Sequence, residues 1–223
     1  MVQSALKLLR RIKPHRVVLN GDVNDFFQLS RFNTELDRID HLQEEIDEAV
    51  NLRAAIRRAC PDADLIETEG NHDHRIRSYV AQNARALTSL RALEPANLFG
   101  WGELDITPVP AAGFLLRKNF LVKHGTLVRG EAGATAKAEL LQAGVSGISG
   151  HTHRLATYRR AGYEQRQWTE QGCLCRLDPA YLVGSPNWTH GIAVGQFSTR
   201  SESFHVDEVH TIDGQFVWGG KRF

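Results

Sequence analysis

The sequence predicts an α/β layered fold with two β-sheets, and three patterns along its 223 residues support this prediction. In the first half of the chain, apolar runs of strand length alternate with stretches of helical periodicity. From residue 114 onward, short strands separated by turn residues are typical of antiparallel hairpins. Polar blocks directly follow several of the apolar runs. Alternation followed by hairpins is the pattern of a layered α/β protein.

The first elements alternate between helix and strand. Val2–Ile12 carries its apolar residues on one helical face, and Pro14 is expected to end this helix because proline cannot continue it. Arg16–Asn20 has the composition of a buried strand. A long helix should follow, beginning at a capping box that Thr34 and Asp37 form.

The long helix is expected to end before Pro61. Its acidic run at residues 44–48 is interpreted as a mostly solvated face. A strand at Asp64–Thr68 and helical turns within Arg75–Leu93 come next. Pro95–Gly113 lacks clean periodicity and is expected to be a loop-rich excursion, of the kind that often shapes a substrate entrance. The apolar stripe of the long helix consists of Leu36, Ile39, Leu42, Ile46, Ala49 and Ile56.

The second half of the chain is expected to be rich in strands. Phe114–Leu116 and Phe120–Val122 should form a hairpin, followed by a helix at Ala132–Ala143 and a strand at Val145–Ser149. Asp213-Gly214 predicts a tight turn. Further strands are predicted at Leu155–Arg160, Gln167–Leu174, Ile192–Phe197, Phe204–Ile212 and Phe216–Trp218.

The amino-acid composition limits the kinds of partner and the cellular location that can be expected. With 42% apolar and 24% charged residues and a net charge of +1, the chain resembles an ordinary globular protein, and no global charge favours nucleic acid or membrane partners. No membrane-spanning run or signal peptide is recognisable, so a cytoplasmic location is expected. Of the three cysteines, Cys173 and Cys175 are interpreted as alternating residues of a strand rather than as metal ligands.

Four short blocks carry the residue types of a metal site. They are Gly21–Asp25, Gly70–Asp73, His124-Gly125 and Gly150–His153, and each follows an apolar run. Each block alone would be read as a turn or as ordinary surface. Separate strand ends can converge on one point, and hard or borderline metals prefer this mixture of carboxylate, amide oxygen and imidazole. Together the blocks predict one metal centre.

In order and spacing, these blocks resemble the calcineurin-like metallophosphoesterases. The stretches Gly172–Leu174 and Trp188–Gly191 are similar to the bacterial and phage branch of that family. The resemblance implies a single domain over residues 1–223 with a four-layer αββα fold, in which two mixed β-sheets pack as a sandwich flanked by helices. It also implies two divalent ions (manganese, iron, zinc or nickel) and a phosphoester substrate.

The resemblance assigns the metal ligands by position. Asp22 matches the carboxylate that bridges the two ions, and Asn71 matches the amide-oxygen ligand of the second ion. His124 and His151 match the two imidazole ligands of that second ion. His153 matches an imidazole ligand of the first ion.

The resemblance also assigns catalytic roles. His72 matches the general acid that protonates the leaving oxygen, and Asp25 matches the carboxylate that orients it. Asp73 is expected either to assist them or only to close the turn. Arg75, followed by Arg31, is the best candidate to bind the phosphate, although an ordinary surface role fits both arginines as well.

One block of the family pattern is absent. Members of the family open with an Asp-x-His strand that supplies two ligands to the first ion, and this sequence has none, which leaves Asp22 and His153. Either the sequence is N-terminally shortened or the protein has lost one ion. Both explanations predict one tightly bound ion and weak hydrolysis of generic aryl phosphates. A non-catalytic scaffold and a nuclease are the alternative functions, but a scaffold would not need His72 and Asp25.

Overall fold

The computed structural model describes residues 1–30, 41–178 and 186–223, with backbone only at residue 212, and it divides into two compact units. The first unit is Leu9–Ala111, and the second unit combines Met1–Leu8 with Ala112–Phe223. Helix α1 (Val2–Ile12), which has the predicted bounds, contributes residues to both. Within the described ranges, no helix is both long and apolar enough to cross a membrane.

The first unit contains a three-stranded parallel sheet in the order β1-β2-β3. Helix α2 (Leu42–Ala59) connects β1 to β2, and α3 (Arg75–Asn83) follows β2. The predicted start of α2 at Thr34 and Asp37 lies outside the described residues. Because the strands are parallel, their carboxyl ends share one edge of the sheet. The strands are β1 (Arg16–Leu19), β2 (Asp64–Thr68) and β3 (Ile106–Val109).

The segment Pro95–Gly113 is loop-rich as predicted, but it also contains strand β3 and the short helix α4 (Pro95–Leu98). β3 has only four residues and contains Pro108, so no strand periodicity marks it in the sequence. Proline is tolerated there because β3 is an edge strand, where a missing N–H costs no ladder hydrogen bond. Two 3-10 turns, η2 (Arg85–Ser89) and η3 (Arg91–Leu93), lie between α3 and α4.

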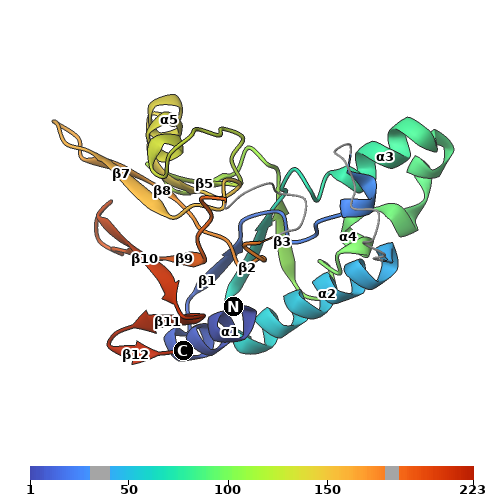
Figure 1. The fold of residues 1–223 in the computed structure, drawn as a ribbon, viewed down its shortest axis with the longest axis horizontal. Coiled ribbons are helices and arrows are strands. Elements are labelled where there is room, and N and C mark those ends of the chain that lie inside the picture. The colour runs from blue at the N-terminus through green and yellow to red at the C-terminus, as the bar shows by residue number, and fades with distance from the viewer. Residues whose placement is uncertain (31–40, 179–185) are drawn as a thin grey trace. The chain divides into compact units, whose positions relative to one another are not determined.

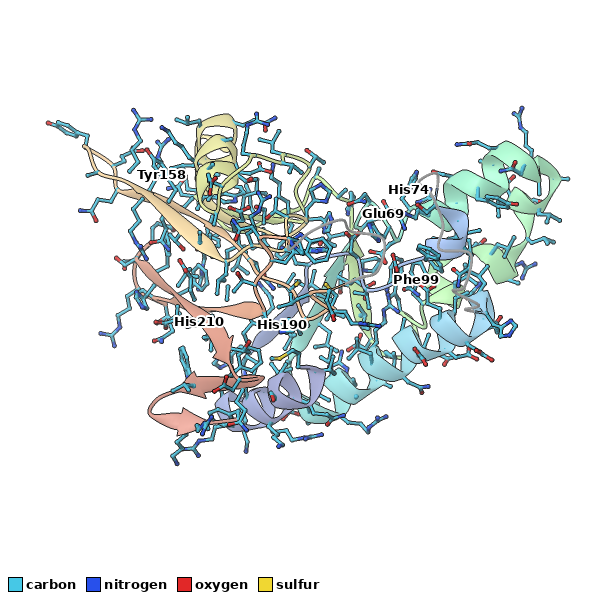
Figure 2. All side chains as sticks on the ribbon, viewed as in Figure 1. Glu69, His74, Phe99, Tyr158, His190 and His210 are labelled. Carbon is cyan, nitrogen blue, oxygen red and sulfur yellow. The ribbon has the colours of Figure 1, made fainter. Side chains whose placement is uncertain are left out.

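The core of the first unit joins its helices to the segment after β1. Phe26 and Phe99 stack with ring centroids 6.0 Å apart, and Ile46 of α2 and Ile76 of α3 complete the buried cluster. Figure 2 labels Phe99 beside these helices. The 3-10 turn η1 (Phe27–Leu29) follows Phe26 directly. Packing in this core therefore fixes the backbone just beyond the first predicted metal block.

The second unit contains a five-stranded mixed sheet in the order β4-β5-β6-β8-β7. β5, β6 and β8 are parallel neighbours, and β4 and β7 pair antiparallel at the edges. Helix α5 (Ala134–Ala143) lies against β7 and β8 (Figure 1), where Leu140 packs on the buried Trp168. Tyr158, labelled in Figure 2, borders the same cluster. The strands are β4 (Phe114–Arg117), β5 (Phe120–Lys123), β6 (Ser146–Ser149), β7 (Ala156–Arg160) and β8 (Arg166–Glu170).

The tail of the second unit forms a four-stranded antiparallel sheet in the order β12-β11-β10-β9. Phe120 of the five-stranded sheet meets Phe197 and Phe204 of this sheet at centroid distances of 4.9 and 4.7 Å. The predicted turn at Asp213-Gly214 is confirmed, since both residues have positive φ and join β10 to β11. The strands are β9 (Gly191–Phe197), β10 (Phe204–Ile212), β11 (Gln215–Trp218) and β12 (Lys221–Arg222).

The predicted α/β class is confirmed, and the aromatic contacts between the two sheets of the second unit are compatible with a sandwich. Among the described residues, the hydrogen-bonded strands form three sheets rather than two, because β1–β3 make a separate parallel ladder. One strand end is also corrected. β8 ends at Glu170, not at Leu174, so the two cysteines that follow lie beyond the strand.

Candidate functional site

Two predicted blocks meet at one sheet edge in the first unit. The Gly21–Asp25 block follows β1 and the Gly70–Asp73 block follows β2, its parallel neighbour. Gly21 and Asp22 both have left-handed backbone, with φ of 81° and 54°. Oδ1 of Asp22 accepts the backbone N–H of His72 at 2.8 Å. The parallel pairing therefore brings the predicted bridging carboxylate next to the predicted general acid.

The Asp73 side chain links the Gly21–Asp25 block to the Gly70–Asp73 block. Its carboxylate accepts backbone N–H groups of Asp22 at 2.7 Å, Asn24 at 3.0 Å and Gly70 at 3.0 Å, and the side chain is 2% exposed. Burial raises the pKa of Asp73 to about 6, assisted by the charges of Glu67 and Asp22 and opposed by the backbone hydrogen bonds. Of its two expected roles, these contacts support that of closing the turn.

Gly70 is required at its position because the chain passes very close to Asp22. A Cβ atom at residue 70 would lie 2.1 Å from Oδ1 and 2.2 Å from the backbone nitrogen of Asp22. We expect Gly70→Ala to lower the free energy of unfolding by about 1–3 kcal/mol or more, because the Asp22 turn must move. Urea denaturation would measure this change.

Gly102→Ala is the matched control for Gly70→Ala, since a Cβ atom at Gly102 would meet nothing within 4 Å. This control should change the free energy of unfolding by no more than about 0.5 kcal/mol. Equal stability of the two variants would show that the Asp22 turn does not depend on the absence of a side chain at residue 70.

His72, Asp25 and Arg75 form a hydrogen-bonded set. Nδ1 of His72 lies 3.0 Å from Oδ1 of Asp25, and Nη2 of Arg75 lies 3.0 Å from Nε2 of His72. A guanidinium group can only donate, so Nε2 accepts and the ring proton sits on Nδ1, facing Asp25. Arg75 also donates to the backbone carbonyl of Asp25 at 2.8 Å. The predicted acid, its orienting carboxylate and the preferred phosphate-binding arginine thus lie together.

Sequence reasoning missed a buried ion pair beneath this set. Arg53 of α2 is 0% exposed, and its guanidinium binds both carboxylate oxygens of Glu67 in β2, at 2.8 and 2.6 Å. It also donates to Oδ1 of Asn24, in the first block, at 3.0 Å. A signal was present, because Arg53 continues the apolar stripe after Ala49 at helical spacing.

The acidic run is mostly a solvated face, as predicted, and its partly buried member is Glu45. Its Oε1 accepts the backbone N–H of Phe26 at 2.6 Å, whereas Glu44, Asp47 and Glu48 are exposed as predicted. Phe26 is fully buried and has a left-handed φ of 47°. Such a backbone costs a non-glycine residue about 1–2 kcal/mol. Glu45 and the aromatic core therefore hold the backbone that carries Asp25.

In the second unit, His124 and His151 follow the parallel neighbours β5 and β6. The backbone N–H of Gly150 donates to the His124 carbonyl at 2.8 Å, and the two rings have centroids 5.2 Å apart at 71°. Two imidazoles on one tetrahedral ion, with metal–nitrogen bonds of ~2.0–2.1 Å, have centroids roughly 5 Å apart. The pair therefore fits one ion. The left-handed φ of 71° at His151 is a strained backbone, which is common at functional sites.

His153 lies in a different environment from that pair. Its ring meets the Trp188 ring at a centroid distance of 4.4 Å, and its Nδ1 lies 3.9 Å from Sγ of Cys175. Ligand atoms of His153, Cys173 and Cys175 all fall within 4.8 Å of one another, so this group could hold a metal ion. The prediction that the two cysteines alternate within a strand is corrected, because β8 ends at Glu170 and Cys173 makes only an isolated parallel bridge with His190.

The two thiols are not equivalent. A hydrogen bond from the Cys173 thiol, together with His153, lowers the pKa of Cys175 to about 5, against the opposing effect of burial. The shared hydrogen bond and burial raise the pKa of Cys173.

The remaining predicted residues are placed as follows. Asn71 is exposed in the turn beyond β2, and Arg31 lies outside the described residues. His74, which was not assigned a ligand role, pairs with Glu69 at 3.2 Å on the surface of the first unit (Figure 2). The structure thus brings predicted residues together within each unit: His72 contacts both Asp22 and Asp25, Asp73 binds Asp22, and His124 lies beside His151.

No protein-family model matches this chain, and no curated protein sequence matches it. The resemblance to the calcineurin-like metallophosphoesterases therefore stays a prediction. The geometry within each unit is the evidence on function.

Proposed function

We propose that this protein is a metal-dependent phosphoester hydrolase. The observation that carries the proposal is the contact of His72 with Asp25 and Arg75, next to the Asp22 carboxylate. An imidazole that a carboxylate orients is suited to general acid catalysis, and a neighbouring guanidinium is suited to bind a phosphate. The proposal includes the αββα sandwich that the resemblance implies.

The donor set suits divalent ions. In the proposal, the metal ligands are the oxygens of Asp22 and Asn71 and the imidazoles of His124, His151 and His153, as the resemblance implies. The 5.2 Å ring separation of His124 and His151 supports the assignment of both to one ion. When bound, the ions would supply an activated water and neutralise charge on the phosphate.

The side chains of the first unit would handle the leaving group. His72 would carry a proton on Nε2 and donate it to the leaving oxygen, while Asp25 stabilises the imidazolium through its contact with Nδ1. For this, Arg75 must exchange its contact with Nε2 for the phosphate oxygens. Its side chain is 17% exposed, and its other contact, with the backbone carbonyl of Asp25, can stay in place during this exchange.

The metal requirement provides the test of the proposed function. His124→Ala and His151→Ala should each weaken Mn²⁺ binding and lower hydrolysis of bis-p-nitrophenyl phosphate, because each removes one imidazole from a shared ion. Loss of one ligand should lower the affinity about tenfold or more. Isothermal titration with Mn²⁺ and a steady-state assay would measure the two effects.

His205→Ala is the matched control, because this histidine is exposed in the same unit and pairs with Asp207, which is not a predicted ligand. It should bind Mn²⁺ and hydrolyse the substrate as the unmodified protein does. If His124→Ala and His151→Ala behave like His205→Ala, the proposed metal centre is wrong. Hydrolysis of single-stranded DNA in preference to small esters would instead indicate the nuclease alternative.

A further inference from the structure

A second group of metal-binding side chains lies at the edge of the five-stranded sheet. β6 and β8 are parallel neighbours, so the chain leaves both strands at the same edge. His153 follows β6 by four residues, and Cys173 and Cys175 follow β8 by three and five. This topology brings an imidazole and two thiols together from segments that are about twenty residues apart.

We propose that His153, Cys173 and Cys175 bind one thiophilic divalent cation, for which Zn²⁺ is the best fit. Two thiolates with one imidazole favour zinc over manganese or magnesium, which prefer oxygen ligands. The site lies within the second unit, and the inference does not depend on the proposed hydrolase. If the hydrolase proposal also holds, the ion that His153 binds in it would be the ion of this site.

The separations of the ligand atoms support the proposal. In a tetrahedral zinc site with Zn–S of ~2.3 Å and Zn–N of ~2.0–2.1 Å, neighbouring ligand atoms are roughly 3.5–3.8 Å apart. Sγ of Cys175 and Nδ1 of His153 are 3.9 Å apart, and the three ligand atoms lie within 4.8 Å of one another. The group is therefore close to binding geometry, and small side-chain rotations suffice to close it.

The backbone around the three ligands is held by its own hydrogen bonds. Thr189 donates its N–H to the His153 carbonyl at 2.8 Å and accepts the Cys173 N–H at 3.0 Å. Nε2 of His190, labelled in Figure 2, lies 2.6 Å from the carbonyl oxygen of Cys175. One segment thus ties all three ligands together, an arrangement that fixes ligand positions before an ion binds.

The ring of Trp188, in the same segment, lies edge-on to the His153 ring and covers part of it. Cys175 is exposed and leaves a path by which an ion can enter. Gly172 permits the close approach of the two segments, because a Cβ atom there would lie 2.5 Å from the Thr189 carbonyl oxygen. The segment with Trp188 and Thr189 therefore covers one side of the site, and the exposed Cys175 leaves the other side open to solvent.

Cobalt is a suitable probe of this site, since Co²⁺ replaces Zn²⁺ and gives a near-ultraviolet charge-transfer band only with thiolate ligands. The reduced protein, titrated with Co²⁺ without oxygen, should develop this band and lose it when Zn²⁺ is added. Cys173→Ser and Cys175→Ser should each diminish the band, and the double variant should abolish it. Cys60→Ala is the matched control and should retain it, because Cys60 is buried in the first unit.

Gly172→Ala tests the positioning of the ligands without removing any of them. We expect it to lower the Co²⁺ affinity about tenfold while the protein remains folded by circular dichroism. Absence of the band in the unmodified protein, or its persistence in the double serine variant, would overturn the proposal. Formation of a Cys173–Cys175 disulfide in place of the cobalt complex, with reductant present, would also overturn it and assign the pair to redox chemistry.

His124→Gln separates this inference from the proposed function. It should leave the thiolate–cobalt band unchanged, because it removes none of the three ligands. An unmodified protein that shows the band but no metal-dependent hydrolysis would refute the hydrolase and support the zinc site. Hydrolysis that depends on His124, without any band, would refute the zinc site and support the hydrolase.

Discussion

His72→Ala is expected to lower kcat for phosphoester hydrolysis by ~10²–10⁴-fold, because it removes the proposed proton donor to the leaving oxygen. Asp25 and Arg75 hold both nitrogens of this imidazole, so its orientation is already set. The loss should depend on the leaving group. It should be large for a phenyl ester, whose oxygen needs a proton, and small for a p-nitrophenyl ester, whose phenolate leaves without one. Steady-state rates with both esters would measure the difference.

His74→Ala is the matched control for His72→Ala. His74 lies two residues further along the chain, but it pairs with Glu69 on the surface and is half-exposed. We expect it to retain the rate of the unmodified protein with both esters. If the two variants lose activity equally, or if the loss at His72 is the same for both leaving groups, His72 is not the general acid.

Arg53→Met is expected to lower the free energy of unfolding by about 3–5 kcal/mol. The substitution leaves the Glu67 carboxylate, which is 1% exposed, without its positively charged partner in a buried environment. It also removes the hydrogen bond to Asn24, in the block that carries Asp22 and Asp25. Metal binding should therefore weaken as well. Urea denaturation followed by circular dichroism would give the change in stability.

Two companion variants identify the cause of the effect at Arg53. Arg58→Met lies on the exposed side of the same helix and should change the free energy of unfolding by no more than about 0.5 kcal/mol. The double variant Arg53→Met with Glu67→Leu should recover much of the loss, since it no longer buries an unpaired charge. A double variant as unstable as Arg53→Met alone would show that packing, rather than charge pairing, determines the stability.

Local sequence patterns predicted most regular elements well. The structure reproduces the predicted bounds of Val2–Ile12, Asp64–Thr68 and Phe204–Ile212, because apolar periodicity and breaker residues act within a few positions of one another. The strand Ile106–Val109 escaped prediction, since four residues that include a proline carry no periodic signal. Its pairing with Asp64–Thr68 depends on a neighbour about forty residues away.

Local patterns alone revealed which side chains follow the strands: a carboxylate and an amide in the first half of the chain, and imidazoles in the second. These are properties of short segments, so composition and turn chemistry reveal them. Which distant groups become partners depends instead on how the elements pair and pack. Arg53 reaches Glu67 because α2 packs on β2, and His153 meets Cys173 and Cys175 because β6 and β8 are parallel neighbours. Strand order and helix packing, which depend on the whole chain, set these distances.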